Sequence, residues 1–232
     1  MSKSFEALEE GQEGFASLFE KEERPPCQLY LISPPAFDLA EHAEALRAAL
    51  GAGGVAAYQL RLKNVSDEEI LRAAEVLQPI CAEHDVAFVL NDRADLAKAC
   101  GADVVHLGQS DGSVAEAREL LGDQVQIGVT CNASRHQAME AGEQGASYVA
   151  FGAFFPTSTK QDVKYMAEPS ILSWWVSLSP IPCVAIGGIT VQNCGPLVEA
   201  GADFLAVSAA IWNAEPTSAV RNFLQVIDKH RK

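Results

Sequence analysis

Short apolar runs alternate with longer amphipathic segments along most of the chain, and this alternation predicts strands followed by helices. Eight runs have the length of buried parallel strands: 29–32, 55–60, 87–90, 104–107, 126–129, 148–151, 183–186 and 204–207. Amphipathic segments between or after them have helical spacing: 67–84, 115–121, 134–144, 191–200 and 217–229. Because parallel strands need long crossovers, usually helices, the alternation predicts a parallel sheet.

A short motif recurs where a helical segment meets the next predicted strand. Gly-Ala-Asp occurs at 101–103 and again at 201–203, and Gly-Ala-Ser occurs at 145–147. Glycine can end a helix in the left-handed conformation, after which the next strand begins at once. Eight strand–helix units predict an α/β fold, a closed (β/α)8 TIM barrel, with an open doubly wound sheet as the weaker alternative.

The composition fits one barrel domain. The chain has 232 residues and 48% apolar content, and we place the barrel domain at residues 27–232. Residues 1–26 carry scattered Phe and Leu among many Glu, which predicts a short acidic N-terminal extension, flexible or peripheral to the barrel. No apolar run approaches the ~18 residues that span a bilayer, and we expect a cytoplasmic protein.

The charge balance narrows the range of partners. There are 17 Lys and Arg against 31 Asp and Glu, so the net charge of −14 disfavours nucleic acid and membrane surfaces. Small anions must then be held by specific local contacts. The six cysteines form no CxxC pair and no cysteine–histidine metal spacing, which predicts reduced, packed thiols. The sequence leaves the oligomeric state open, a homo-oligomer included.

Polar residues cluster after the predicted strands, at the rim where barrel enzymes carry their active sites. In chain order the clusters contain Gln59, Arg61 and Lys63, then Asn91 and Asp92, Asp111, Thr130, the segment 155–160, and Gly187 with Gly188. The first and eighth strands contribute at most Ser33 and Ser208. The sequence therefore predicts one site at the carboxyl ends of the strands.

Two of these clusters suit phosphate. Thr157 and Thr159 can donate hydrogen bonds to phosphate oxygens, and Lys160 can neutralise their charge. Gly188 stands between a predicted strand and a helical segment, where backbone N–H groups can approach a phosphate, although a purely steric turn explains the glycine equally well. Two phosphate-like sites on one chain suggest a phosphorylated substrate.

The other clusters suit a strongly anionic group and a cation. The period of two places Gln59, Arg61 and Lys63 on one face of an extended segment, where they hold an anion or form an ordinary salt-bridge network. Asp92 and Asp111 follow adjacent strands and can share magnesium, which prefers few carboxylates together with phosphate oxygens and water. Each aspartate alone can equally be a helix N-cap.

Five motifs in order resemble the thiamine-phosphate synthase family, within the thiamine-phosphate synthase and thiazole tautomerase superfamily, over about residues 29–211: YQLRLK, NDRADLAKACGADVVHLGQSD, IGVT, FPTSTK and AIGGIT. The resemblance implies a (β/α)8 barrel and a transferase of thiamine biosynthesis. Its reaction would join 4-amino-2-methyl-5-pyrimidinylmethyl diphosphate to thiazole phosphate, with release of diphosphate.

The resemblance also implies residue roles. Contacts to the pyrimidine diphosphate would come from Gln59, Arg61, Lys63 and Asn91, with Thr130 where the family usually has serine, and magnesium would be held by Asp92 and Asp111. Thr157, Thr159 and Lys160 would belong to a loop shared by thiazole phosphate and diphosphate. Gly188 would give its backbone N–H to the thiazole phosphate, and backbone N–H groups of the segment at Ser208 would bind phosphate. Lys63 and Lys160 would act catalytically, by stabilising charge on the leaving diphosphate.

The sequence departs from the family's usual residues at three places, and three other functions are considered beside the synthase. The family usually has Ser-x-His at 130–132, Val-Ser at 208–209 and Gly-Pro at 152–153, where this chain has Thr-Cys-Asn, Ser-Ala and Gly-Ala. A thiazole tautomerase would rely on a histidine where Asn132 stands. A non-catalytic phosphate-ligand-binding barrel fits the altered loops, and a Schiff-base aldolase would use Lys63 or Lys160.

Overall fold

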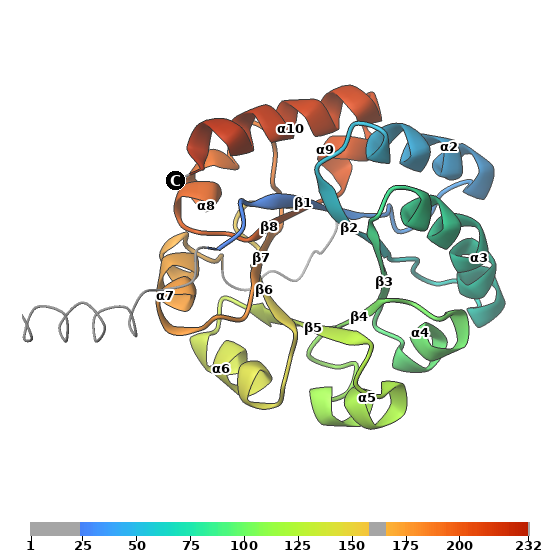
Figure 1. The fold of residues 1–232 in the computed structure, drawn as a ribbon, viewed down its shortest axis with the longest axis horizontal. Helices are drawn as coiled ribbons and strands as arrows, with labels where there is room; N and C mark the ends of the chain where they lie inside the picture. The colour runs from blue at the N-terminus through green and yellow to red at the C-terminus, as the bar shows by residue number, and fades with distance from the viewer. Residues whose placement is uncertain (1–23, 158–165, 232) are drawn as a thin grey trace, which may run out of the picture.

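The computed structural model describes residues 24–157 and 166–231 and shows a closed barrel of eight parallel strands (Figure 1). Each strand pairs with the next in chain order, and β8 pairs with β1. The strands are β1 (Gln28–Ile32), β2 (Val55–Leu60), β3 (Ala87–Asn91), β4 (Val104–Leu107), β5 (Gln126–Asn132), β6 (Tyr148–Gly152), β7 (Cys183–Ile186) and β8 (Phe204–Val207). The (β/α)8 barrel is confirmed, and the open sheet is excluded.

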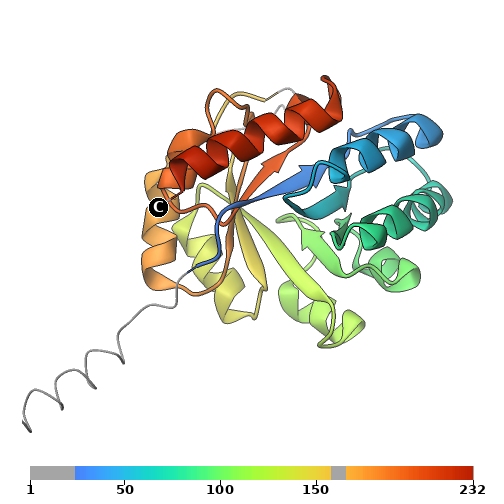
Figure 2. The ribbon, with the colours of Figure 1, turned by 45° about the horizontal axis from the view of Figure 1, so that its top comes forward.

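Helices surround the strands as an outer ring (Figure 1). They are α2 (Leu39–Leu50), α3 (Asp67–Glu83), α4 (Ala94–Cys100), α5 (Val114–Leu121), α6 (Arg135–Glu143), α7 (Ser170–Leu178), α8 (Gly195–Glu199), α9 (Ala209–Trp212) and α10 (Pro216–His230). Figure 2 shows the last helix, α10, lying beside α2. The Thr217 hydroxyl donates to the Ala48 carbonyl at 3.1 Å, so the ring of helices is closed as well.

Two predicted elements differ from the observed ones by more than one residue at an end. The helical segment predicted at 191–200 is reduced to α8, because Asn193 folds back on the preceding turn and accepts the Thr190 amide at 2.8 Å. Strand β5 continues past Val129 to Asn132, with a register shift against β6 between Thr130 and Asn132. The extension carries Thr130 into the strand.

The repeated glycine motif joins neighbouring strands at their amino ends. Gly101, Gly145 and Gly201 have left-handed φ angles of 68°, 86° and 95°, as the sequence predicts. The third residue of each motif accepts an amide from the preceding strand: Asp103 from Phe88, Ser147 from Ile127 and Asp203 from Cys183, at 2.8, 3.0 and 2.7 Å. The motif therefore both ends a helix and links the strands on either side of it.

Side chains fill the barrel interior. The inner cluster is buried and contains Tyr30, Ile32, Val89, Val104, Tyr148, Ala150, Val184 and Ala206, contributed by six strands. A Cβ atom on Gly128 would lie 1.9 Å from Cζ of Tyr148, so the Tyr148 ring occupies the space over this glycine. A second, larger cluster packs the outer faces of the strands against the helices.

The cysteines are structural. All six are free thiols, and five of them are buried. Burial raises the pKa of Cys81 and of Cys131 to about 12, which keeps both protonated at neutral pH.

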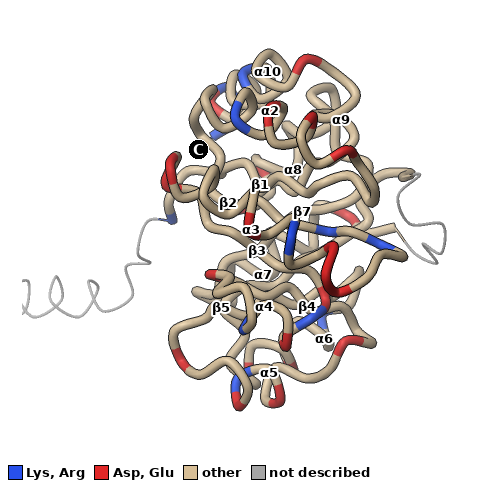
Figure 3. The backbone as a smooth tube through the Cα atoms, turned by 90° about the vertical axis from the view of Figure 1, so that its right-hand side faces the viewer, with Lys and Arg blue, Asp and Glu red and all other residues tan. Residues whose placement is uncertain are grey.

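Charged positions are interspersed over the side of the molecule drawn in Figure 3. Among the helices that the structure describes, none is both long enough and apolar enough to cross a bilayer.

Candidate active site

Lys63 and Asp92 meet at the carboxyl ends of β2 and β3. The Lys63 Nζ lies 2.5 Å from Oδ2 of Asp92, and both side chains are partly exposed. Asp92 has a left-handed φ of 67°, and its amide donates to the His106 carbonyl of β4 at 2.8 Å. The backbone that aims Asp92 at Lys63 is therefore fixed by the neighbouring strand.

Asp111 lies next to Asp92. Burial and, after it, the Asp92 carboxylate raise the pKa of Asp111, because a second negative charge so close is unfavourable. Neither aspartate is a helix cap, since α4 is preceded by Arg93 without a side-chain cap and α5 is capped by Ser113. Two adjacent carboxylates without a capping role suit a divalent cation.

The two carboxylates are not a complete metal site. Within the described ranges 24–157 and 166–231, no group of three or more His, Cys, Asp or Glu side chains could hold a metal ion. Magnesium at Asp92 and Asp111 would take its other ligands from substrate oxygens and water, which matches its usual preference.

Gln59 and Lys63, near the carboxyl end of β2, make separate side-chain hydrogen bonds, to Asn91 and to Asp92. Gln59 is buried, and its Nε2 donates to Oδ1 of Asn91 at 2.7 Å. Arg61 follows the end of β2, and its amide donates to Oγ of Ser33 at 2.8 Å. Ser208 Oγ also reaches Ser33, donating to its carbonyl at 3.3 Å. Ser33, a minor candidate in the sequence, therefore links the ends of β1, β2 and β8.

Thr130 opens a buried polar chain. Its Oγ1 lies 2.8 Å from Nε2 of His106, whose Nδ1 lies 2.9 Å from the Tyr148 hydroxyl. Gln109 Nε2 donates to the Thr130 carbonyl at 2.5 Å. Burial lowers the pKa of His106 to about 4, so its ring is neutral at physiological pH. His106 is therefore a buried histidine with both ring nitrogens hydrogen-bonded, and the sequence does not reveal its link to Thr130.

The two predicted phosphate segments lie against each other. Gly188 has a left-handed φ of 64°, and a Cβ there would lie 2.4 Å from the carbonyl oxygen of Pro156. The Phe155 amide donates to the Gly187 carbonyl at 3.0 Å. Thr157 follows directly, whereas Thr159 and Lys160 lie outside the described residues. Gly188 is thus required by the close approach of the loop after β6.

Asn132, at the position of a family histidine, faces a helix. It has a left-handed φ of 51°, and its Nδ2 donates to Oε1 of Gln137 in α6 at 3.3 Å. The side chain is therefore engaged at the outer edge of the site.

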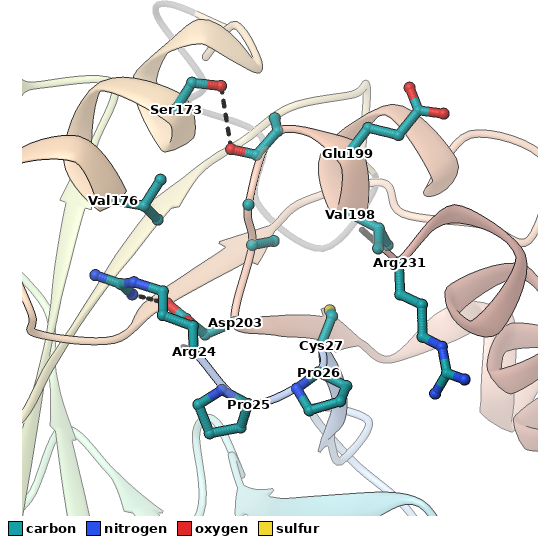
Figure 4. Close-up of a pocket in the computed structure, with 13 residues that line it drawn as sticks. Arg24, Pro25, Pro26, Cys27, Ser173, Val176, Val198, Glu199, Asp203 and Arg231 are labelled. Atoms are coloured by element: carbon teal, nitrogen blue, oxygen red, sulfur yellow. Dashed lines mark hydrogen bonds and ion pairs between the residues drawn. The ribbon is translucent and has the colours of Figure 1, made fainter. Parts of the chain in front are cut away.

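A cavity of about 330 Å³ lies at the opposite end of the barrel, where the strands begin (Figure 4). Arg24 crosses it, pairing with Oδ2 of Asp203 at 2.6 Å and donating to the Ser179 carbonyl. The Arg24–Asp203 ion pair joins the segment before β1 to the segment before β8. We therefore interpret this cavity as a structural feature at the amino ends of the strands and not as part of the strand-end site.

Comparisons with known proteins agree on one family. The family model described as thiamine monophosphate synthase matches residues 29–211. Curated relatives named thiamine-phosphate synthase include proteins of Rhodospirillum centenum, 58% identical over 87% of this chain and 98% of the relative, and of Erythrobacter litoralis, 57% identical over 87% and 96%. A solved thiamine phosphate pyrophosphorylase of Pyrococcus furiosus superimposes with a TM-score of 0.76 at 31% identity, over 87% and 96% of the two chains.

Proposed function

The chain belongs to the thiamine monophosphate synthase family, and from this premise we propose how its strand-end residues carry out the reaction. The protein is a transferase that makes thiamine phosphate. It joins the pyrimidinylmethyl diphosphate to thiazole phosphate and releases diphosphate. The observation that carries the assignment of residues is the Lys63–Asp92 pair beside Asp111 at the carboxyl ends of adjacent strands.

Two groups of residues bind the two substrates. Gln59, Arg61, Lys63 and Asn91 surround the pyrimidine diphosphate, and Thr130 faces the pyrimidine ring. The Gln59–Asn91 hydrogen bond holds both amides in fixed orientations before the substrate arrives. The thiazole phosphate binds between the loop at Thr157 and the backbone at Gly188, with Thr159, Lys160 and the segment at Ser208 completing the site.

Asp92 and Asp111 hold magnesium. The support is chemical: burial and, after it, the neighbouring Asp92 carboxylate raise the pKa of Asp111, and a bound cation would offset the repulsion between the two carboxylates. When bound, magnesium supplies positive charge to the diphosphate oxygens. Lys63, already at Asp92, adds a second positive charge on the same side of the site.

The reaction needs charge stabilisation more than proton transfer. The bond between the pyrimidine methylene carbon and the diphosphate oxygen breaks, and the electron pair leaves with diphosphate. The thiazole nitrogen then donates its lone pair to the methylene carbon, forming the new C–N bond. Lys63 and Lys160 stabilise the departing charge, while the closed barrel floor excludes water from the cationic carbon.

The rival functions lack comparable support. Asn132 replaces the histidine on which a tautomerase would rely, and it is bound to Gln137. A Schiff-base aldolase needs a lysine amine that is free to attack a carbonyl carbon, whereas the Lys63 Nζ is engaged in an ion pair with Asp92. A non-catalytic barrel would bind both substrates without forming product.

The deciding experiment measures thiamine phosphate formation from the two substrates, with magnesium and then with excess chelator. Product should require magnesium, and Asp92→Asn and Asp111→Asn should each lower turnover by about a hundredfold or more, as loss of a preorganised charge contact does. Asp228→Asn, which removes the same charge from the exposed surface of α10, is the matched control. Full activity of a well-folded Asp92→Asn variant would remove the magnesium assignment.

A further inference from the structure

A chain of four buried or half-buried side chains crosses the barrel interior below the proposed site. We propose that the hydrogen bonds from Tyr30 through Tyr148 and His106 to Thr130 run in one direction, and that they fix the Thr130 hydroxyl as a hydrogen-bond donor toward the pyrimidine substrate. The substrate end of this inference rests on the proposed function. Tyr30, Tyr148 and His106 are thereby positioning residues that act through Thr130.

The geometry of the chain is continuous. The Tyr30 and Tyr148 hydroxyl oxygens are 3.0 Å apart, Tyr148 lies 2.9 Å from Nδ1 of His106, and Nε2 of His106 lies 2.8 Å from Oγ1 of Thr130. The residues come from β1, β6, β4 and β5. Four strands therefore contribute to one path from the barrel interior to its mouth.

Packing holds these groups in place. Tyr30, Tyr148 and His106 are 3%, 7% and 7% exposed, so the chain is shielded from water along most of its length. The His106 and Tyr148 rings stack at 5.6 Å with an interplanar angle of 23°, and the two tyrosine rings meet edge to face at 6.1 Å. Gly128 lies in β5, which pairs with β4 on one side and β6 on the other. Because it has no side chain, it leaves the space that the Tyr148 ring fills.

The direction follows from the inner end of the chain. Among the described residues, the Tyr30 hydroxyl has Tyr148 as its hydrogen-bond partner. If Tyr30 accepted that hydrogen bond, its own O–H would point into an apolar interior without an acceptor. An unsatisfied buried donor is less tolerable than an unused lone pair of an oxygen that already takes part in a hydrogen bond. Tyr30 therefore donates to Tyr148.

The hydrogen bond from Tyr30 then fixes the direction of each hydrogen bond that follows it. Tyr148 accepts from Tyr30 and uses its single hydrogen to donate to Nδ1 of His106. A ring nitrogen that accepts a hydrogen bond carries no hydrogen, so the ring hydrogen of His106 lies on Nε2 and His106 donates to Oγ1 of Thr130. The hydroxyl hydrogen of Thr130 is left for an acceptor elsewhere. A pyrimidine ring nitrogen is an acceptor of the required kind.

The tautomer of His106 tests the direction without any substrate. In protein labelled with ¹⁵N-histidine, long-range ¹H–¹⁵N spectra at pH 7 distinguish a protonated ring nitrogen from an unprotonated one, and the spectrum of His106→Gln identifies the His106 signals. We expect hydrogen on Nε2. Hydrogen on Nδ1 would overturn the inference even if the protein makes thiamine phosphate, so this result is separate from the fate of the proposed function.

Tyr30→Phe tests the consequence for the substrate. Without the terminal donor, His106 should show both tautomers, and the KM for the pyrimidine diphosphate should rise by about threefold to tenfold, the effect of one net hydrogen bond. The KM for thiazole phosphate should stay unchanged, which a general loss of folding would not produce. Equal changes in both KM values, or a single unchanged tautomer, would contradict the positioning role.

Ser147→Ala and Thr130→Val complete the comparison. Ser147→Ala removes another partly buried hydroxyl hydrogen bond, at the amino end of β5, and should leave the His106 tautomer and both KM values as they are. Thr130→Val removes the proposed donor and should raise the KM for the pyrimidine diphosphate alone. If that KM does not change, Thr130 does not face the pyrimidine, and both its place in the proposed site and this inference fail.

Discussion

Replacing Gly128 with alanine should destabilise the barrel through a single contact. A Cβ at this position would lie 1.9 Å from Cζ of Tyr148, 2.3 Å from its Cε1 and 2.4 Å from its hydroxyl oxygen. An ordinary contact begins at 3.4 Å, so the ring would have to retreat by about 1.5 Å. Gly128 is absent from the residues with positive φ, so backbone strain adds nothing and the cost is steric.

The magnitude follows from what the ring loses. Overpacking of a well-packed interior costs about 1–3 kcal/mol. A retreating ring also gives up its hydrogen bonds to His106 and Tyr30, at about 1 kcal/mol each. Alanine is favoured over glycine in a strand by about 0.5–1 kcal/mol, which offsets part of the loss. The free energy of unfolding should fall by about 2–4 kcal/mol.

Urea unfolding followed by circular dichroism measures this loss, and a double-mutant cycle assigns it. In a Tyr148→Leu background the side chain ends short of the Cζ position, so adding Gly128→Ala should cost less than about 1 kcal/mol. Gly142→Ala in α6, whose Cβ would meet the flexible end of Ile181 at 3.2 Å, is the control and should change stability by less than about 1 kcal/mol. Equal costs of Gly128→Ala in the two backgrounds would refute the steric argument.

Three further outcomes follow from the charges. Because the pKa of Asp111 is raised in the native state, the unfolded chain loses this proton first, and Asp111 lowers stability as the pH rises through that window. Asp111→Asn should therefore raise the free energy of unfolding of the metal-free protein at pH 7, by less than about 1 kcal/mol because the side chain is partly exposed. At pH 3 the substitution should give no gain. An equal gain at both pH values would contradict this. Asp203→Ala, which loses the Arg24 ion pair and a backbone bond, should cost about 2–3 kcal/mol in urea unfolding, more than Asp103→Ala, which loses the backbone bond alone. Lys63→Met should lower kcat more than it raises either KM, and steady-state kinetics showing only a raised KM would limit Lys63 to binding.

The strands could be predicted from the sequence because they are buried on both faces. Continuous apolar runs of four to six residues between glycine and polar turns allow few other readings, and four of the eight predicted strands agree with the structure at both ends: 55–60, 104–107, 183–186 and 204–207. The segments listed above for their helical spacing do not include α2, although its capping residue, Asp38, stands in the sequence and accepts from two amides of the first turn.

The site likewise has one part that could be predicted from the sequence and one part that could not. Adjacent strands bring Asp92 and Asp111 together whatever the details of packing, so their proximity could be expected from order along the chain alone. The hydrogen-bonded side chains below them could not be expected from the sequence. Tyr30 and Tyr148 stand inside apolar runs and count there as hydrophobic residues, and the space over Gly128 exists only in the register that sets Gly128 beside Tyr148. Contacts across non-adjacent strands depend on side-chain direction, which a one-dimensional pattern does not contain.

The electrostatics of the mouth suggest why the substrate and its cation should arrive together. The chain carries a net charge of −14, and the strand-end site adds two neighbouring carboxylates of which Lys63 is paired with one. A bare diphosphate would be repelled by such a field, whereas its magnesium complex carries less negative charge. Asp111, whose pKa is raised by burial and by the nearby Asp92 carboxylate, would gain from that cation. The acidic composition and the paired aspartates thus favour the same ligand, a metal-bound diphosphate held at the ends of β3 and β4.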